Sequence, residues 1–198
     1  MNEKSHDTKQ HILDIGYELV ASKGFTGVGL SELLKNAEVP KGSFYHYFKS
    51  KEQFGEALLQ DYFNHYQQKL ENLFANSDMS EYEKLMQYWR YWMEQNSSAC
   101  QTGKCLVVKL AGEVSDLSEP MRLALHKGTD RVIITVAELI EKGIQSGEIN
   151  VKDSRQTSEL LYNLWIGASL INKIRLDDAS LVQALKVTEQ VLKGEQLN

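Results

Sequence analysis

The sequence has few cysteines, few prolines and no long apolar run. Two cysteines among 198 residues exclude the disulfide framework of a small secreted scaffold. Apolar runs are short, as at 106–108, so we expect no segment that spans a bilayer. The first ten residues are polar, unlike a signal peptide. These absences favour a soluble, cytoplasmic protein without membrane contact.

The net charge of −5 and a sequence pI near 5.6 argue against nucleic-acid binding by the chain as a whole. The charge is unevenly distributed, because residues 1–52 contain as many lysines as carboxylates and the rest of the chain carries the whole excess. Lys41, Lys49 and Lys51 lie close together within that neutral segment. A local cationic edge is therefore compatible with an acidic chain.

Apolar residues recur at intervals of three and four along most of the chain, and the alternation typical of strands is nearly absent. The two prolines, Pro40 and Pro120, interrupt none of these periodic segments. Breaks are predicted before the capping pattern that starts at Ser50, at 97–103 and at Gly147. The pattern predicts an all-α fold.

The N-terminal part divides into three predicted helices, at about 8–23, 30–37 and 42–47. The two short helices, separated by a Glu-Val-Pro turn, have the layout of a helix-turn-helix. The second helix of such a unit lies in the major groove with its N-terminal end at the base edges. We therefore expect a DNA-binding head at 1–52, joined to a helical body at 53–198 that senses a ligand or oxidant and dimerises.

The helix predicted at 42–47 offers polar groups that suit DNA. Gly42 allows the backbone to approach closely, and the N–H groups of a helix start favour a phosphate. Tyrosine and histidine reach phosphate oxygens or stack on sugars and thymine methyl groups. Phe44 and Phe48 are expected to face inward. The candidate contacts are Lys41, Gly42, Ser43, Tyr45, His46, Tyr47 and Lys51.

Residues 42–52, G-S-F-Y-H-Y-F-K-S-K-E, meet every fixed position of the signature G-x-[LF]-Y-x-[YH]-F-x-[SN]-K-E. With the segment 25–34 they make the chain resemble the TetR family of bacterial repressors. The resemblance implies an all-helical homodimer, built mainly on its last two long helices, that leaves operator DNA when a ligand binds the body. It also implies DNA contacts at the positions named above and at Ser31 in the preceding helix.

Two positions depart from the family pattern. The turn before the reading helix usually has Gly and here has Glu38, whose Cβ costs about 1 kcal/mol if the backbone is left-handed. The Thr that usually caps the second helix is replaced by Gly29, which offers no side-chain acceptor.

The body is rich in aromatic residues, and Trp89, Trp92 and Trp165 can either line a ligand pocket or fill the core. Late in the chain, two apolar stripes, with small residues at 167–169, predict helices that pair with a second subunit or form an intramolecular core. Their members are Leu160, Leu164, Trp165, Ala168, Ile171, Leu181, Leu185 and Leu192.

Cys105 opens an apolar helix predicted at 106–114 and has Lys104 and Lys109 nearby in sequence. A helix N-terminus and cationic neighbours lower the pKa of a thiol and raise its reactivity towards oxidants and electrophiles. Cys100 and Cys105 lack a second ligand pair, so no metal is expected. The alternative for either cysteine is a small buried hydrophobe.

Residues 103–110 and 164–168, together with Lys173, resemble one branch of the TetR family, the repressors of N-ethylmaleimide reductase. The resemblance implies that quinones, aldehydes or hypochlorous oxidants are sensed through Cys105. It also implies that the amine of Lys173 pairs with or traps the oxidised sulfur. Ser115 stands where the branch has a second cysteine.

The leading hypothesis is a TetR-type repressor that leaves operator DNA when an electrophile or oxidant modifies Cys105. An alternative replaces covalent sensing by reversible binding of a small apolar inducer in the body pocket. An enzyme is not expected, because no Ser/His/Asp set, phosphate loop or metal-ligand spacing occurs, and no cofactor is expected. A helical interaction module without specific DNA binding is the remaining alternative.

Overall fold

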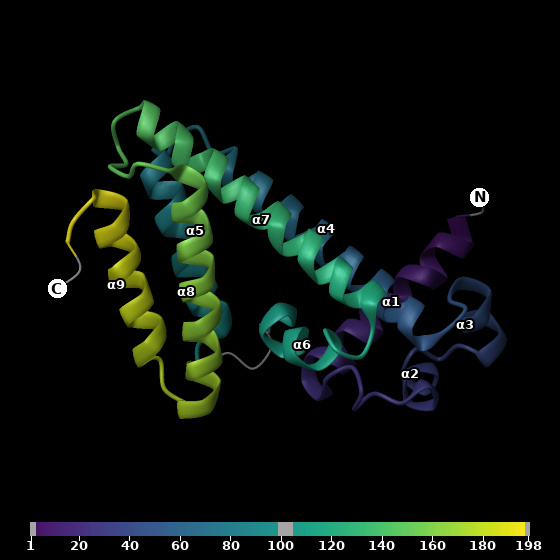
Figure 1. Ribbon diagram of the computed structural model, residues 1–198. Coiled ribbons are helices and arrows are strands. Elements are labelled where there is room, and N and C mark those ends of the chain that lie inside the picture. The colour runs from purple at the N-terminus through teal and green to yellow at the C-terminus, as the bar shows by residue number, and fades with distance from the viewer. Residues whose placement is uncertain (1–2, 99–104, 197–198) are drawn as a thin grey trace. The chain divides into compact units, whose positions relative to one another are not determined.

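The computed structural model describes residues 3–98 and 105–196. Within these ranges, every element of regular secondary structure is an α-helix (Figure 1). The predicted all-α fold is confirmed. None of the helices in the described ranges is long and apolar enough to cross a membrane. The helices are α1 (Glu3–Lys23), α2 (Leu30–Asn36), α3 (Lys41–Tyr47), α4 (Lys51–Phe74), α5 (Glu81–Asn96), α6 (Leu106–Val114), α7 (Glu119–Gln145), α8 (Ser154–Arg175) and α9 (Ala179–Lys193).

Side-chain caps explain where two long helices of the body begin. α5 follows Ser80, whose hydroxyl accepts from the Glu83 N–H while the Glu83 carboxylate accepts from the Ser80 N–H. This reciprocal pair is a complete capping box. α8 follows Asp153, whose carboxylate accepts from the Gln156 N–H. Each cap satisfies an N–H group that has no acceptor within its own helix.

The capping pattern at the start of α4 is confirmed in one half. Ser50 Oγ accepts from the Gln53 N–H at 3.1 Å. The Gln53 side chain accepts from the N–H of Lys49 at 2.5 Å and not from that of Ser50, so the reciprocal bond lies one residue earlier than in a capping box. Both bonds connect the segment that joins α3 to α4 with the first turn of α4.

The two departures from the family pattern have the expected local consequences. Glu38, in the turn between α2 and α3, has φ +53°, in the left-handed region. A residue with a Cβ costs about 1 kcal/mol there. Gly29 is the N-cap of α2 and makes no side-chain capping bond. The helix-turn-helix layout forms nevertheless.

Contacts between residues divide the chain into two compact units. The head unit comprises Met1–His65 and Lys109–Gly128, and the body unit comprises Tyr66–Val108 and Thr129–Asn198. α4, α6 and α7 each contribute residues to both units. The head unit therefore combines the predicted DNA-binding segment with residues that come much later in the chain. A functional boundary at residue 52 stays a prediction.

Two glycines let helices of the head unit approach closely. A Cβ at Gly16 of α1 would collide with the ring of Phe54 in α4, and a Cβ at Gly128 of α7 would collide with the ring of Phe63 in α4. Both rings are buried. α1 and α7 therefore contact aromatic rings of α4 at positions where no side chain intervenes. Other large buried side chains of this core are Ile12, Phe25, Leu33, Phe44 and Phe48.

Buried indole N–H groups connect the helices of the body unit, in which α9 packs against both α5 and α8 (Figure 1). Trp92 of α5 donates from Nε1 to Ser169 Oγ of α8 at 2.9 Å. Trp165 of α8 donates from Nε1 to Thr188 Oγ1 of α9 at 2.9 Å. Because buried polar groups need partners, these two bonds help to fix how the three helices pack.

The apolar stripes of α8 and α9 divide between core and surface. For four members the intramolecular alternative holds, because their side chains are buried within the subunit: Trp165, Ala168, Leu181 and Leu192. The exposed apolar side chains of these helices are Leu160, Leu170, Ile171, Ile174 and Val182. A second subunit can therefore be contacted by only a part of the predicted stripes.

Candidate DNA-binding surface and cysteine site

α3 presents different residues to the core and to the surface. Phe44 is fully buried, and its ring lies 5.2 Å from that of Phe48 and 5.8 Å from that of Phe54 between centroids. The next residue, Tyr45, is 47% exposed. The inward orientation expected of Phe44 and Phe48 is confirmed. These aromatic contacts anchor α3 so that its polar positions remain at the surface.

The predicted DNA contacts on α3 are accessible. Lys41, Gly42, Tyr45 and His46 are exposed, and Ser43 and Tyr47 are half-buried. Lys41 Nζ lies 5.8 Å from the centre of the Tyr45 ring, and the His46 ring meets that of Tyr47 edge-on at 4.8 Å. A Cβ added at Gly42 would meet nothing within 4 Å, so the fold itself does not require glycine there.

Ser31 and Lys51, the remaining predicted contacts, lie outside α3. Ser31 is exposed in the first turn of α2. Lys51 is half-buried, its Nζ donates to the Phe25 carbonyl at 2.8 Å, and it lies 4.6 Å from the centre of the Phe25 ring. Lys51 therefore binds the turn that follows α1, and its contact with a phosphate stays a prediction.

Glu113 of α6 is a candidate that the sequence reasoning missed. Its carboxylate accepts from the Phe25 N–H at 3.1 Å and from the N–H and Oγ1 of Thr26, both at 2.5 Å. Burial by itself would raise the pKa of this carboxyl, but the bonds from Thr26 and Phe25 outweigh burial and hold the pKa below its usual value. The partners are 87 and 88 positions apart, a separation to which no spacing rule applies.

Cys105 directly precedes α6 and is half-buried, which confirms its predicted place at a helix N-terminus. Two buried tyrosines of the body unit, Tyr88 and Tyr162, are near enough to Cys105 to be affected by its charge. Burial raises the pKa of Tyr88 and of Tyr162, and negative charge on Cys105 raises both further. The Tyr88 hydroxyl also shares a hydrogen bond of 2.9 Å with that of Tyr66. Phenol groups are therefore part of the surroundings of the sulfur.

The basic residues expected to act on Cys105 have different environments. Lys173 is exposed on α8. Lys109 donates from Nζ to the carbonyl of Ser22 at 3.0 Å, at the end of α1. Lys104 and Cys100 lie outside the described residues. The pairing of Lys173 with an oxidised Cys105 stays a prediction.

The three tryptophans considered for a ligand pocket form one packed cluster. Trp89, Trp92 and Trp165 are all buried, and the ring of Trp92 lies 5.9 Å from Trp89 and 6.4 Å from Trp165 between centroids. Trp89 Nε1 has no hydrogen-bond partner among the described residues. Close mutual packing favours the core role, and a role in lining a pocket stays a prediction.

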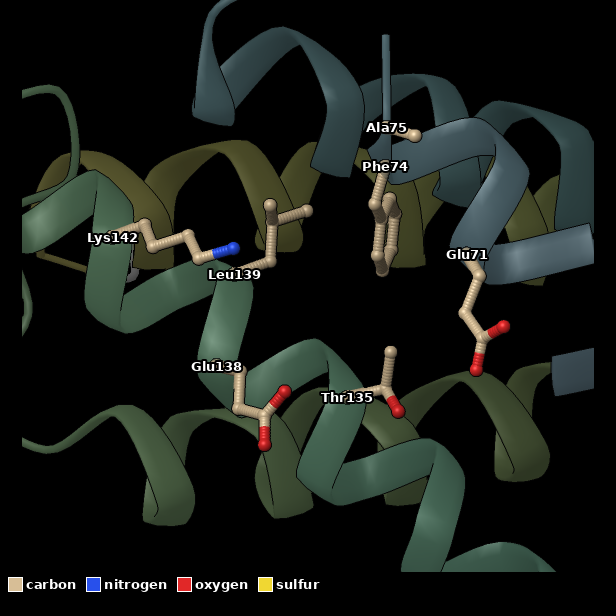
Figure 2. A pocket seen from close by; sticks show the side chains of 7 residues that line it. All are labelled: Glu71, Phe74, Ala75, Thr135, Glu138, Leu139 and Lys142. Carbon is tan, nitrogen blue, oxygen red and sulfur yellow. The ribbon is translucent and has the colours of Figure 1, made fainter. Parts of the chain in front are cut away.

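A groove of about 250 Å³ lies in the body unit between the end of α4 and α7 (Figure 2). It is lined by Glu71, Phe74, Ala75, Thr135, Glu138, Leu139 and Lys142. Figure 2 shows the ring of Phe74 pointing from α4 towards Thr135 and Leu139 of α7. None of the predicted site residues lines this groove. Within the described residues, no group of three or more side chains is arranged to hold a metal ion.

Comparisons with known proteins found relatives of both the N-terminal and the C-terminal part of the chain. Residues 12–58 match the family of bacterial regulatory proteins, tetR family, and residues 82–188 match the tetracyclin repressor-like C-terminal domain. The chain is 41% identical over 191 residues to the HTH-type transcriptional repressor NemR of Escherichia coli K12, covering 94% of each. It is 32% identical over 168 residues to the transcriptional regulator AcuR of Cereibacter sphaeroides, covering 84% of this chain and 77% of AcuR.

Solved structures give the same result. The crystal structure of reduced E. coli NemR matches with a TM-score of 0.90 and 41% identity, over 94% of this chain and 97% of that one. The regulatory protein TetR of Rhodobacter sphaeroides matches with a TM-score of 0.81 and 29% identity, over 92% and 97% of the two chains. The similarity therefore extends over nearly the whole chain in sequence and in structure.

Proposed function

The chain belongs to the TetR family of bacterial regulatory proteins, and on that premise we propose that it is a homodimeric transcriptional repressor that leaves its operator when an electrophile or oxidant modifies Cys105. The observation that carries the proposal is that one chain combines an exposed polar α3 with a half-buried cysteine directly before α6. Its similarity to NemR, a transcriptional repressor by name, supports it. The protein acts in the cytoplasm on double-stranded DNA.

The proposed DNA contacts come from α3. Lys41 binds a phosphate, while Tyr45 and His46 reach phosphates, sugars or base edges from their exposed positions. Gly42 leaves room for a close approach of DNA, because it has no side chain and the space where its Cβ would be is open. In a dimer, two copies of α3 lie about 34–36 Å apart and enter successive major grooves on one side of the duplex.

The proposed dimer interface is the exposed apolar face of α8 and α9. Leu160 is 56% exposed and Ile174 is 69% exposed, so water would otherwise cover large apolar side chains on one helix. Gly167 of the same helix has open space where its Cβ would be, which lets a partner helix approach closely. A twofold interface brings this face of each subunit against its copy.

The proposed signal is a chemical change at Cys105. The thiolate adds to an activated C=C bond, a C–S bond forms as the π bond breaks, and the adjacent carbon takes a proton from water. The adduct adds volume where α6 begins, next to buried aromatic residues, and packed helices respond to such a change by moving as units. A hundredfold loss of operator affinity requires about 3 kcal/mol. The Lys173 amine is proposed to pair with the oxidised sulfur.

The sensing test compares operator affinity before and after treatment with N-ethylmaleimide, at one salt concentration because phosphate contacts make affinity salt-dependent. The DNA is a duplex that the reduced protein selects from a random-sequence pool. We expect about a hundredfold weaker binding after treatment of the wild type and of Cys100→Ser, the matched control, and unchanged binding for Cys105→Ser. Release of treated Cys105→Ser would contradict the proposal, and release by a removable apolar compound would support the reversible alternative.

The DNA-contact test pairs two exposed tyrosines. Tyr45→Ala on α3 should weaken operator binding about tenfold with an unchanged melting temperature, whereas Tyr91→Ala, which removes a tyrosine of similar exposure on α5, should bind like the wild type. Fluorescence anisotropy with the selected duplex measures both. Equal affinities for the two variants would exclude Tyr45 from the DNA contacts.

The dimer test places a charge on α8. Ile174→Glu puts a carboxylate next to its own copy in the proposed interface, so sedimentation velocity should show monomers where the wild type shows dimers. Glu159→Gln, an exposed change near the other end of α8, serves as a control. A monomeric wild type at micromolar concentration would end the proposal of a dimer.

A further inference from the structure

The turn between α1 and α2 is held by a carboxylate that comes from much later in the chain. Glu113, in the last turn of α6, accepts three hydrogen bonds, from the Phe25 N–H and from the N–H and hydroxyl of Thr26. All of these residues belong to the head unit. The turn itself follows directly on α1, and α2 begins four residues after Thr26.

The shape of the turn fits this carboxylate. Gly24 has φ +82° and is buried, a conformation that side chains disfavour, and it directs the next two N–H groups to one place. Successive N–H groups of this kind form a concave binding site for an anion. A Cβ at Gly24 would lie 2.8 Å from Glu113 Oε2, so the carboxylate occupies the space that a side chain would need.

Two lysines donate hydrogen bonds to backbone carbonyls at the end of α1 and in the turn that follows it. Lys51, the first residue of α4, donates to the Phe25 carbonyl at 2.8 Å, and Lys109 of α6 donates to the Ser22 carbonyl at 3.0 Å. Phe25 is therefore bound at its N–H by a carboxylate from α6 and at its carbonyl by an ammonium from α4. This arrangement connects α6 to the two helices that flank the helix-turn-helix.

We propose that Glu113 is a positioning residue for DNA binding: its carboxylate holds the α1–α2 turn in the arrangement that lets α3 bind the operator, and loss of this hold is part of operator release. The inference rests on the proposed function, because α6 starts directly after Cys105. Eight residues of helix separate the two positions by about 12 Å. A displacement of α6 caused by an adduct at Cys105 therefore moves the Glu113 carboxylate relative to its three donors.

The test uses Glu113→Gln, which keeps the shape of the side chain and removes its charge, and Glu141→Gln, an exposed change on α7 in the body unit, as the matched control. Thr26→Val removes the hydroxyl donor, and Thr26→Ser retains it. Three quantities are measured for each variant: the melting temperature, the affinity of the reduced protein for the selected duplex, and the ratio of affinities before and after treatment with N-ethylmaleimide.

We expect reduced Glu113→Gln to bind about tenfold more weakly than the wild type and to show a smaller ratio on treatment, since part of the coupling is already lost. Thr26→Val should change both quantities in the same direction, while Thr26→Ser and Glu141→Gln should match the wild type. Thr26→Val decides the question if Glu113→Gln does not fold at the assay temperature.

Two results would overturn the proposal. One is wild-type affinity for reduced Glu113→Gln. The other is a loss of affinity by the same factor in both states, because an unchanged ratio indicates a structural role alone. If N-ethylmaleimide does not release the wild type from DNA, that result contradicts the sensing function instead. The DNA affinities of Glu113→Gln and Glu141→Gln in the reduced state then still decide whether Glu113 positions the head.

Discussion

The indole of Trp89 in α5 lies nearly parallel to the indole of Trp165 in α8, with ring centroids 5.1 Å apart and an angle of 11° between the planes. Both side chains are fully buried. Offset stacking of this kind adds about 0.5–1.5 kcal/mol to the gain from burial alone. The pair therefore couples α5 to α8 in the centre of the body unit.

Trp165→Ala should lower the free energy of unfolding by about 3–5 kcal/mol, because it leaves a cavity beside Trp89 and removes the donor to Thr188. Denaturation by urea, followed by circular dichroism, measures the change. Tyr91→Ala, at an exposed position of α5, should change stability by less than about 0.5 kcal/mol. A loss below about 1 kcal/mol for Trp165→Ala would show that the body repacks around the missing ring.

Modification of Cys105 should change the tryptophan fluorescence of the body unit. Tyr88 lies 4.4 Å from Trp89, and Tyr162 lies 5.8 Å from Trp92, between ring centroids. An adduct that shifts these tyrosines moves the polar groups around buried indoles, because a close-packed interior transmits strain. The emission maximum is recorded before and after treatment with N-ethylmaleimide. Cys105→Ser should show no shift, and an unshifted wild type with one adduct at Cys105 by mass spectrometry would contradict the prediction.

Lys41 and Lys51 should respond differently when each is changed to methionine. Lys41→Met should reduce the slope of log affinity against log salt by about one unit per subunit, as expected for a lost phosphate contact. Lys51→Met should keep the slope and instead cost about 1–2 kcal/mol of stability, because the Phe25 carbonyl loses its charged donor. Titrations at several salt concentrations and thermal melts separate the two effects. A reduced slope for Lys51→Met would instead support the phosphate contact that the sequence predicts for Lys51.

The stability of the protein should fall in acid partly through Glu113. Its pKa in the folded protein lies below the usual value, mainly because its bonds from Thr26 and Phe25 outweigh the effect of burial. The unfolded chain therefore binds the proton more readily than the folded one. The contribution is fully present above the ordinary glutamate pKa of about 4.3 and is lost as the pH falls through the lower folded pKa. Glu113→Gln should show a shallower loss of stability over that range, and a loss as steep as in the wild type would contradict this.

Local signals in the sequence predict most of the helices. Ser80 and Gly24 mark the start of α5 and the end of α1 through capping and a positive φ, respectively, and each acts on residues within one turn. The apolar spacing predicts a first helix that starts at about residue 8, whereas α1 begins at Glu3. The early residues are polar, so the apolar spacing that signals a helix is missing from them.

The relationships that spacing cannot show are those between distant segments. Apolar residues at intervals of three and four show which side of a helix is packed against something, but not whether the partner belongs to the same subunit. Trp165 and Leu160 therefore belong to one predicted stripe, although only Trp165 is buried within the subunit. In the same way, Lys51 has the charge of a phosphate ligand, but its half-buried place beside Phe25 depends on the tertiary fold.

The missing side chains at Gly16 and Gly128 limit how the protein can give up its DNA. With a ring of α4 filling the space beside each glycine, α1 and α7 cannot slide along α4 without steric overlap inside the head unit. α3 packs on the same α4 through Phe44 and Phe54. We therefore expect α1, α4 and α7 to keep their packing when the operator is released, and the movement proposed for the α1–α2 turn to occur without displacing these three helices along one another.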